Sequence, residues 1–210
     1  MSKAVERALR VLIFIGNSEQ HTTMSNICEE LDIPKASASD ILHTLMDQGF
    51  VRIVDEERKT LGLGEQILKL GSAYRNRTNY MTIIHAEMKA LASQENRTIF
   101  YWICQQNKMM LMDRALSPTG IYPNVEVGAM ETMDSLIGRV YREKKFGQEQ
   151  MADRKIWCFA VPLFDVDGRM AGVISTYDLA SLSSEEMQAK TKEALLACTK
   201  EIAGKIHVGY

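Results

Sequence analysis

A short stretch of the chain combines small, polar and basic side chains: Lys35, Ala36, Ser37, Ser39, Asp40 and His43. Hydroxyl, ammonium and imidazole groups can hydrogen-bond to phosphate oxygens or base edges, and small residues allow close approach of a backbone. The aspartate can accept from a cytosine amino group or repel phosphate, and its residue type does not decide between the two. The stretch suits contact with duplex DNA, although an ordinary helical hairpin carries similar patterns.

Two short helices separated by a tight turn would position this stretch. Thr23 is a good N-cap for the first helix, because its hydroxyl can accept from a free amide of the first turn. Pro34 fits the first turn of the second helix, where no backbone N–H is required, and Gly49 provides its stop. Helix, turn and helix is the arrangement by which many proteins place a second helix in the major groove.

A strand hairpin is predicted after the second helix. Phe50–Val54 and Thr60–Gly64 have strand composition, and five charged residues lie between them. A hairpin after a helix-turn-helix would form a wing, with Arg52, Arg58 and Lys59 along phosphates or in the minor groove. A charged turn that stands alone is more often a solvated loop.

The residue order from Val5 to Gly71 resembles, without a gap, the N-terminal winged helix of IclR-type transcriptional regulators. The resemblance rests on VERALRVLIFI, on TMSNICEELDIPKASASDILHTLMDQGFV and on LGLGEQILKLG. It implies a winged helix-turn-helix domain at residues 1–64 and a linker helix at 65–79. It also implies that such domains pair, so that each reads one half-site of a palindromic operator in a homodimer or tetramer.

The first helix, Ala4–Ile15, has apolar residues on one side: Val5, Leu9, Leu12 and Ile13. We expect this stripe to pack under the other two helices. In the resembled family it also contributes to a dimer contact.

The remainder of the chain predicts an α+β domain at residues 80–210. A helix at 81–94 precedes strands at 98–104, 109–116 and 122–127, and Asp134 is expected to cap a second helix. Strands at 156–164 and 170–177 flank a turn at Asp167-Gly168. Ser183 with Glu186 forms a capping-box pattern for a last helix, which runs to about residue 207. The segments WCFAVPLFDVDGRMAGVIST and METMDSLIGRVY again resemble the IclR family, which implies a GAF-like effector-binding fold.

This domain is shorter than the resemblance implies. The family usually carries several tens of further residues between Lys145 and Lys155, where a short polar segment stands here. The resemblance implies a pocket for a small organic acid effector, at positions matched by Ser135, Gly138, Cys158, Ser175 and Tyr177. For Cys158 and Ser175 the alternatives are a buried core thiol and a satisfied strand hydroxyl.

Composition limits the other classes of function. Hydrophobic residues make up 46% of the 210 residues, with no run long enough to span a membrane and an amphipathic N-terminus unlike a signal peptide. The four scattered cysteines favour reduced thiols in a cytoplasm, and the dispersed cysteines and histidines predict no metal site or cofactor. Net charge is −2, and residues 1–71 hold eight basic and eleven acidic side chains, a net charge of −3. DNA affinity would then depend on local clustering of the basic residues and on dimerisation.

The sequence therefore predicts a ligand-responsive DNA-binding regulator and no enzyme. One alternative is a regulator whose sensor domain has degenerated and which binds DNA or a protein partner constitutively. A second alternative is a thiol redox enzyme using Cys104 and Cys158.

Overall fold

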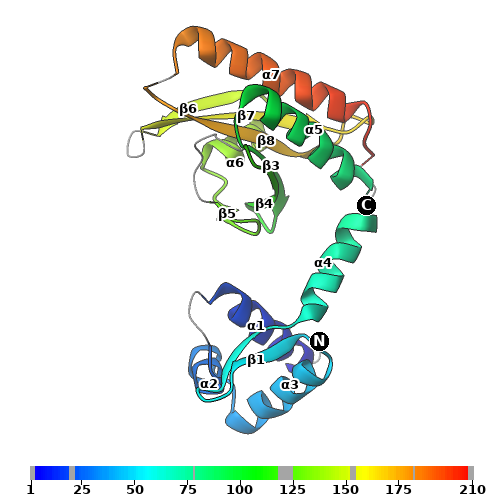
Figure 1. Cartoon of the computed structure of the whole chain (residues 1–210), viewed down its shortest axis with the longest axis vertical. Helices are drawn as coiled ribbons and strands as arrows, with labels where there is room; N and C mark the ends of the chain where they lie inside the picture. The colour runs from blue at the N-terminus through cyan, green and yellow to red at the C-terminus, as the bar shows by residue number, and fades with distance from the viewer. Residues whose placement is uncertain are drawn as a thin grey trace. The chain divides into compact units, whose positions relative to one another are not determined.

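The computed structural model describes residues 3–18, 22–77, 79–117, 125–151, 155–181 and 183–207. The chain divides into two compact units, Met1–Arg77 and Thr78–Tyr210. Figure 1 shows the elements of both.

Unit 1 is a three-helix domain with a two-stranded wing and a following helix. Its elements are α1 (Lys3–Asn17), α2 (Met24–Leu31), α3 (Lys35–Asp47), β1 (Val51–Asp55), β2 (Thr60–Leu63) and α4 (Glu65–Arg77). The three helices and the antiparallel hairpin share one core, made of Val11, Ile15, Ile27, Ile33, Ala38, Leu42, Leu45, Val51 and Leu61. The N-terminal fold is the one that the sequence predicts.

The turn between α2 and α3 is closed by local hydrogen bonds. Thr23 caps α2, since its side chain accepts from the amide of Asn26 and the Asn26 side chain accepts from the Thr23 amide. Asp32 ends α2 in the left-handed conformation, with φ 51°. Gly49 has φ 72° just beyond α3, a conformation that glycine adopts without steric cost.

The prediction for α1 was wrong for three of its four stripe residues, and only Leu12 packs partly against the core. Val5, Leu9 and Ile13 are 60%, 55% and 63% exposed, whereas Val11 and Ile15 are buried. Val11 lies roughly 160° around the axis from Leu9, on the opposite face of the helix. The helix is apolar on two faces, and its tertiary contacts select the face that contains Val11.

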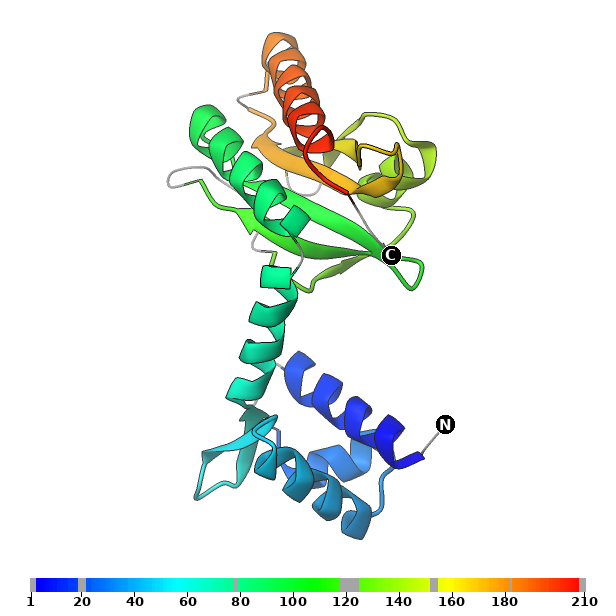
Figure 2. The ribbon, with the colours of Figure 1, turned by 90° about the vertical axis from the view of Figure 1, so that its right-hand side faces the viewer.

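Unit 2 is a six-stranded antiparallel sheet with helices on both faces. Its elements are α5 (Asn79–Glu95), β3 (Ile99–Gln105), β4 (Lys108–Ala115), β5 (Met130–Glu131), α6 (Leu136–Glu143), β6 (Gly147–Met151), β7 (Ile156–Phe164), β8 (Met170–Leu179) and α7 (Glu185–Ala203). The strand order is β5-β4-β3-β8-β7-β6. Helices α5 and α7 lie side by side over one face, and α6 lies on the other (Figures 1 and 2).

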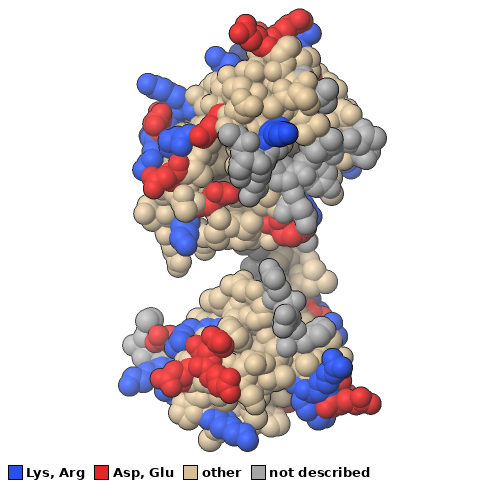
Figure 3. Space-filling model, turned by 90° about the vertical axis from the view of Figure 1, so that its left-hand side faces the viewer, with Lys and Arg blue, Asp and Glu red and all other residues tan. Residues whose placement is uncertain are grey.

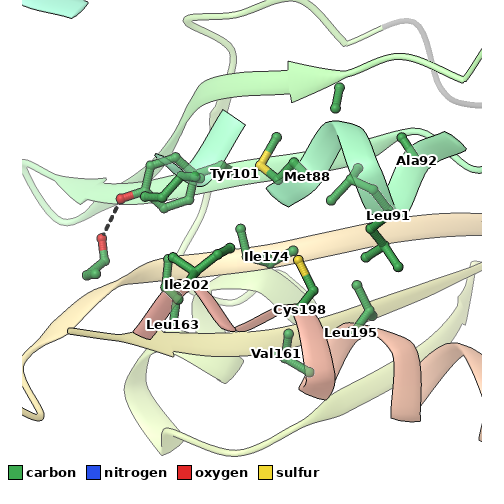
Figure 4. Packing of buried hydrophobic residues seen from close by; sticks show 14 of the residues in the cluster. Met88, Leu91, Ala92, Tyr101, Val161, Leu163, Ile174, Leu195, Cys198 and Ile202 are labelled. Atoms are coloured by element: carbon green, nitrogen blue, oxygen red, sulfur yellow. Dashed lines mark hydrogen bonds between the residues drawn. The ribbon is translucent and has the colours of Figure 1, made fainter. Parts of the chain in front are cut away.

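A continuous apolar core lies between the sheet and the pair α5 and α7. Figure 4 shows Met88 and Leu91 of α5 and Leu195 and Ile202 of α7 packed in one core with Val161 and Ile174 of the sheet. The Tyr101 hydroxyl lies at one end of this core and donates to the carbonyl of Ala171 at 2.8 Å. A large aromatic side chain is therefore accommodated in the core with its polar atom satisfied.

Two predicted helix caps in unit 2 fall one residue early. Ser135, not Asp134, caps α6, because its hydroxyl accepts from the amide of Gly138. Ser184, not Ser183, caps α7 in the same way. In each case two adjacent residues have capping side chains, and the backbone places only the second at the cap position.

Two strand predictions also need correction. Of the strand expected at 122–127, residues 122–124 lie outside the described residues and 125–127 are not a strand; β4 pairs instead with Met130–Glu131. The segment from Lys144 to Lys155, which showed no core pattern, contains β6. This edge strand pairs with β7 as far as Ala160, so Pro162 lies past the end of β6, where it leaves no gap in the β6–β7 hydrogen-bond ladder.

The wing joins α4 through a close backbone approach that admits only glycine. A Cβ on Gly64 would lie 2.2 Å from the carbonyl oxygen of Gly49. At Gly71, within α4, an added Cβ would meet nothing within 4 Å.

We therefore expect opposite effects from two glycine-to-alanine changes in unit 1. Gly64→Ala should lower the free energy of unfolding by about 1–3 kcal/mol through backbone displacement. Gly71→Ala should raise it by about 0.5–1 kcal/mol, because alanine has the higher helix propensity. Urea denaturation of the full chain, followed by circular dichroism, measures both. Equal midpoints for the two variants would contradict the close approach at Gly64.

Candidate nucleic-acid interface and effector pocket

The outer face of α3 presents all six of the polar and small residues selected from the sequence. Lys35, Ala36, Asp40 and His43 are exposed, and Ser37 and Ser39 are partly exposed. The inner face of the helix, with Ala38, Leu42 and Leu45, is buried in the core of unit 1. The alternative of a helical hairpin enclosed in a core does not fit this exposure.

The N-terminus of α3 is open toward solvent. Pro34 occupies the N-cap position and makes no side-chain cap hydrogen bond, and Lys35 begins the helix. The first amides of a helix carry partial positive charge and lack intrahelical acceptors. With an exposed lysine beside them, these groups can bind a phosphate.

The three cations of the wing are exposed and make weak local contacts. The Arg52 side chain donates from Nε to the carbonyl of Leu63 at 3.3 Å. Arg58 Nε lies 4.0 Å from an oxygen of Asp55, and Lys59 Nζ lies 2.8 Å from an oxygen of Glu56. Exposed pairs of this kind contribute little to stability, so a phosphate can compete for the same cations.

A hollow of about 170 Å³ joins α3 to the wing. Its wall is mainly apolar, and its polar lining residues are Ser39 and His43 from α3 and Lys59 from the wing hairpin. The fold therefore brings together residues that are sixteen or more positions apart in the sequence. Helix and wing can contact one duplex as a single surface.

Charges of both signs are mixed on the visible face of the molecule. On the face shown in Figure 3, Lys and Arg side chains alternate with Asp and Glu, with no broad basic patch. On this face, attraction to DNA would depend on individual cations and not on a broad basic surface.

Unit 2 contains a pocket of about 500 Å³, which is lined by residues of α6, of the edge strands β5 and β6, and of the strands β7 and β8. Its lining residues are Glu131, Asp134, Ser135, Leu136, Ile137, Arg139, Glu149, Gln150, Met151, Cys158 and Tyr177. Three of the five positions expected to bind an effector, Ser135, Cys158 and Tyr177, lie in this wall.

The other two expected positions are not in the wall. A Cβ on Gly138 would lie 2.4 Å from the backbone of Met133, so this glycine serves the packing of α6 against the preceding loop. Ser175 is fully buried, and its hydroxyl accepts from the indole nitrogen of Trp102 at 2.9 Å. This is the satisfied strand hydroxyl that the sequence left open as an alternative.

The Cys158 thiol forms part of the pocket floor and stays protonated. Burial raises its pKa to about 12, a hydrogen bond with Tyr177 opposes that rise, and the charges of Glu131 and Glu149 add to it. Burial likewise raises the pKa of Cys198 to about 12. Neither group has the depressed pKa that thiol catalysis needs.

Three charged lining residues were not found from the sequence. Glu131 comes from β5, Arg139 from α6 and Glu149 from β6. Glu131 and Glu149 lie in segments without a clear periodicity, and Arg139 lies on the polar side of the helix predicted after Asp134. Pairing of β6 with β7 places Glu149 opposite Cys158, which no local pattern indicates.

Contacts near the C-terminal end of β8 hold the side chain of Tyr177 in place. The Tyr177 ring packs edge-on against Phe100, with ring centroids 5.3 Å apart and planes at 85°. The next residue, Asp178, pairs with the nearly buried Arg97 at 2.9 Å, and Arg97 also donates to Thr191 of α7. A partly desolvated ion pair of this kind is costly to break from one side only.

No group of three or more metal-ligating side chains occurs among the described residues. No described helix has the length and apolarity to span a bilayer.

The thiols should differ sharply in reactivity. At pH 8 about one Cys158 thiol in ten thousand is ionised if its pKa is about 12. We expect iodoacetamide to modify the partly exposed Cys28 and Cys104 well before Cys158 and Cys198, as measured by peptide mass spectrometry of the native protein. Since the folded pKa lies above that of the unfolded thiol, stability should hold below about pH 9 and fall as pH rises toward 12. Rapid alkylation of Cys158 would instead support thiol chemistry.

Residues 4–55 match the family model described as the IclR helix-turn-helix domain. The glycerol operon regulatory protein of Streptomyces coelicolor is 26% identical over 157 residues, which cover 73% of this chain and 61% of that protein. The transcriptional repressor IclR of Escherichia coli is 24% identical over 108 residues, 50% of this chain and 38% of that protein. The chain thus spans less than two thirds of the length of these relatives, which are named as regulators and not as enzymes.

Solved structures share the fold over nearly the whole chain. An IclR regulator from Alicyclobacillus acidocaldarius has a TM-score of 0.81 at 18% identity, covering 97% of this chain and 98% of its own. An IclR homologue from Microbacterium hydrocarbonoxydans, complexed with 4-hydroxybenzoate, has a TM-score of 0.75 at 12% identity, covering 96% and 98%. Residues 4–55 thus form an IclR helix-turn-helix domain, and the whole chain shares the two-part fold of solved IclR regulators.

Proposed function

We propose that this protein is a DNA-binding transcriptional regulator whose second unit binds a small effector. One observation carries the DNA-binding part. In an IclR helix-turn-helix domain, the exposed face of α3 and the wing cation Lys59 meet around a single hollow. Ser37, Ser39 and His43 would contact base edges, and Lys35, Arg52 and Arg58 would contact phosphates. Such a regulator would act in the cytoplasm, where bacterial DNA is located.

The protein would bind a palindromic operator as a homodimer or tetramer. The exposed stripe Val5, Leu9 and Ile13 lies at i, i+4 and i+8 on α1, so the three side chains form one apolar ridge. Side chains of this size, more than half exposed and adjacent, suit an interface between copies. Pairing two units would double the phosphate contacts available from each weakly charged domain.

The pocket of unit 2 supports an effector-responsive regulator over a constitutive one. At about 500 Å³ it falls within the range of small-molecule sites, and it combines an apolar floor with polar groups at its rim. The family member in complex with 4-hydroxybenzoate supports ligand binding by this fold. A thiol enzyme has no such support, because the pocket thiol is held in its protonated form.

DNA binding can be measured by gel-shift titration with promoter fragments near the protein's own gene. Lys35→Ala or Arg58→Ala should each weaken binding by on the order of tenfold and lower the salt dependence by about one released counterion. Lys200→Ala, on α7, is the matched control and should change neither quantity. If the wild-type protein retards no fragment at low salt, the regulator proposal fails.

Dimerisation through α1 can be tested by Leu9→Glu. We expect this variant to sediment as a monomer where the wild type is a dimer, because two carboxylates would enter an apolar contact. Its unfolding free energy should change by only about 0.5 kcal/mol, since Leu9 is already mostly exposed. Leu196→Glu, at an exposed leucine of α7, is the control. If that variant separates the protomers and Leu9→Glu does not, the contact lies on unit 2.

A further inference from the structure

The described wall of the unit 2 pocket carries three carboxylates and one cation. The carboxylates are Glu131, Asp134 and Glu149, and the cation is Arg139. Full ionisation gives the wall a net charge of −2. A regulator of organic acids needs a free cation or free amide donors at its pocket, so the availability of Arg139 decides which ligand charge fits.

Arg139 is already engaged by the protein. Its Nη1 donates to the carbonyl of Asp134 at 2.9 Å, and its Nη2 donates to the Glu149 carboxylate at 2.5 Å. A ligand carboxylate could take this guanidinium only by displacing Glu149. That exchange would leave Glu149 unpaired and add a further negative charge to an acidic wall.

The start of α6 is a poor anion site because one of its first amides is already bound and a carboxylate lies beside it. The Ser135 hydroxyl already accepts from the amide of Gly138, as the N-cap of this helix. Asp134, one residue earlier, places a further carboxylate at the same helix end. An anionic ligand would therefore find the Gly138 amide occupied and a negative side chain beside the remaining amides.

Glu131 is the carboxylate that lacks a counter-ion. Asp134 lies 3.7 Å from Arg142, and Glu149 pairs with Arg139. Glu131 is half-buried on β5 and has no ion-pair partner among the residues that the structure describes. Its charge acts on the pocket floor, because it contributes to the raised pKa of Cys158. A partly desolvated carboxylate without a partner favours a cation beside it.

The rest of the wall fits an apolar body of modest size. Leu136, Ile137, Met151 and the ring of Tyr177 line the pocket together with the neutral thiol of Cys158. We propose that the effector of this pocket carries an ammonium group that pairs with Glu131, on an apolar or aromatic body, and that it is not an organic acid. This inference rests on the proposed function, because it names the class of effector for the same site.

Three probes with one ring and different end groups test the charge preference in the full-length protein. Tyramine carries an ammonium, tyrosol a hydroxyl and 4-hydroxyphenylacetate a carboxylate on a 4-hydroxyphenyl ring. Calorimetric titration and thermal shift should give tyramine the highest affinity, about tenfold or more above the carboxylate. Glu131→Gln should reduce tyramine affinity by about fivefold to tenfold and leave tyrosol affinity unchanged. Glu143→Gln, on α6 outside the pocket, should change neither.

Two results would overturn this inference. One is tighter binding of 4-hydroxyphenylacetate than of tyramine, which would leave the proposal of an effector pocket intact. The other is the absence of binding by all three probes, which would remove the pocket as a site for such ligands. Gel shift with the unliganded protein tests the DNA-binding proposal independently of both results. The unliganded melting temperature of Glu131→Gln shows that its loss of binding is not a loss of folding.

Discussion

The antiparallel register between β7 and β8 is the constraint on which unit 2 depends. Successive side chains of a strand point to opposite faces, so Phe159 and Val161 enter the core under α5 and α7, while Cys158 and Ala160 face α6. Cys158 pairs with Tyr177 across the two strands. A slip of one residue would exchange the two cores and remove the thiol and the tyrosine ring from the pocket.

The same register connects the pocket to the helices on the other face. Tyr177 lines the pocket, and the adjacent Asp178 pairs with Arg97, directly after α5. Arg97 also contacts Thr191 of α7 through a hydrogen bond. A ligand that moves the Tyr177 ring therefore acts on a strand end that is tied to both helices. A continuous chain of contacts therefore joins the pocket wall to the segment after α5 and to α7.

Sequence patterns predicted those features that depend on neighbours in the chain. The Thr23 cap, the turn before Pro34 and the β7–β8 hairpin around Gly168 each follow from residues a few positions apart. The fold class and the outward face of α3 followed from the same local periodicity. The family resemblance, which covered both units, supplied the order of domains that periodicity alone could not provide.

The errors arose where tertiary contacts choose between locally equal options. Helix α1 is apolar on two faces, and only packing decides that Val11 is inside and Leu9 outside. Strand β6 has no apolar pattern because it is an edge strand, and its partner β7 defines it. The charges of the pocket come from β5, α6 and β6, so their assembly could be seen only after the sheet order was known.

Unit 1 holds ten basic and eleven acidic side chains, so it carries no net positive charge that would attract DNA as a whole. Asp55 and Glu56 lie beside Arg58 and Lys59, and their negative charges partly cancel the positive charges of the wing. The wing therefore attracts phosphate only at short range, within about one Debye length. Asp40 adds a negative charge to the exposed face of α3, where a carboxylate can either repel phosphate or accept from a cytosine amino group. One such domain would therefore bind unspecific DNA weakly. Joining two through the ridge of Val5, Leu9 and Ile13 would raise affinity only at sites where both helices fit at once. In such a pair, specificity would depend on how well the distance between the two α3 helices matches the spacing of the half-sites, and a ligand-induced movement would change that distance.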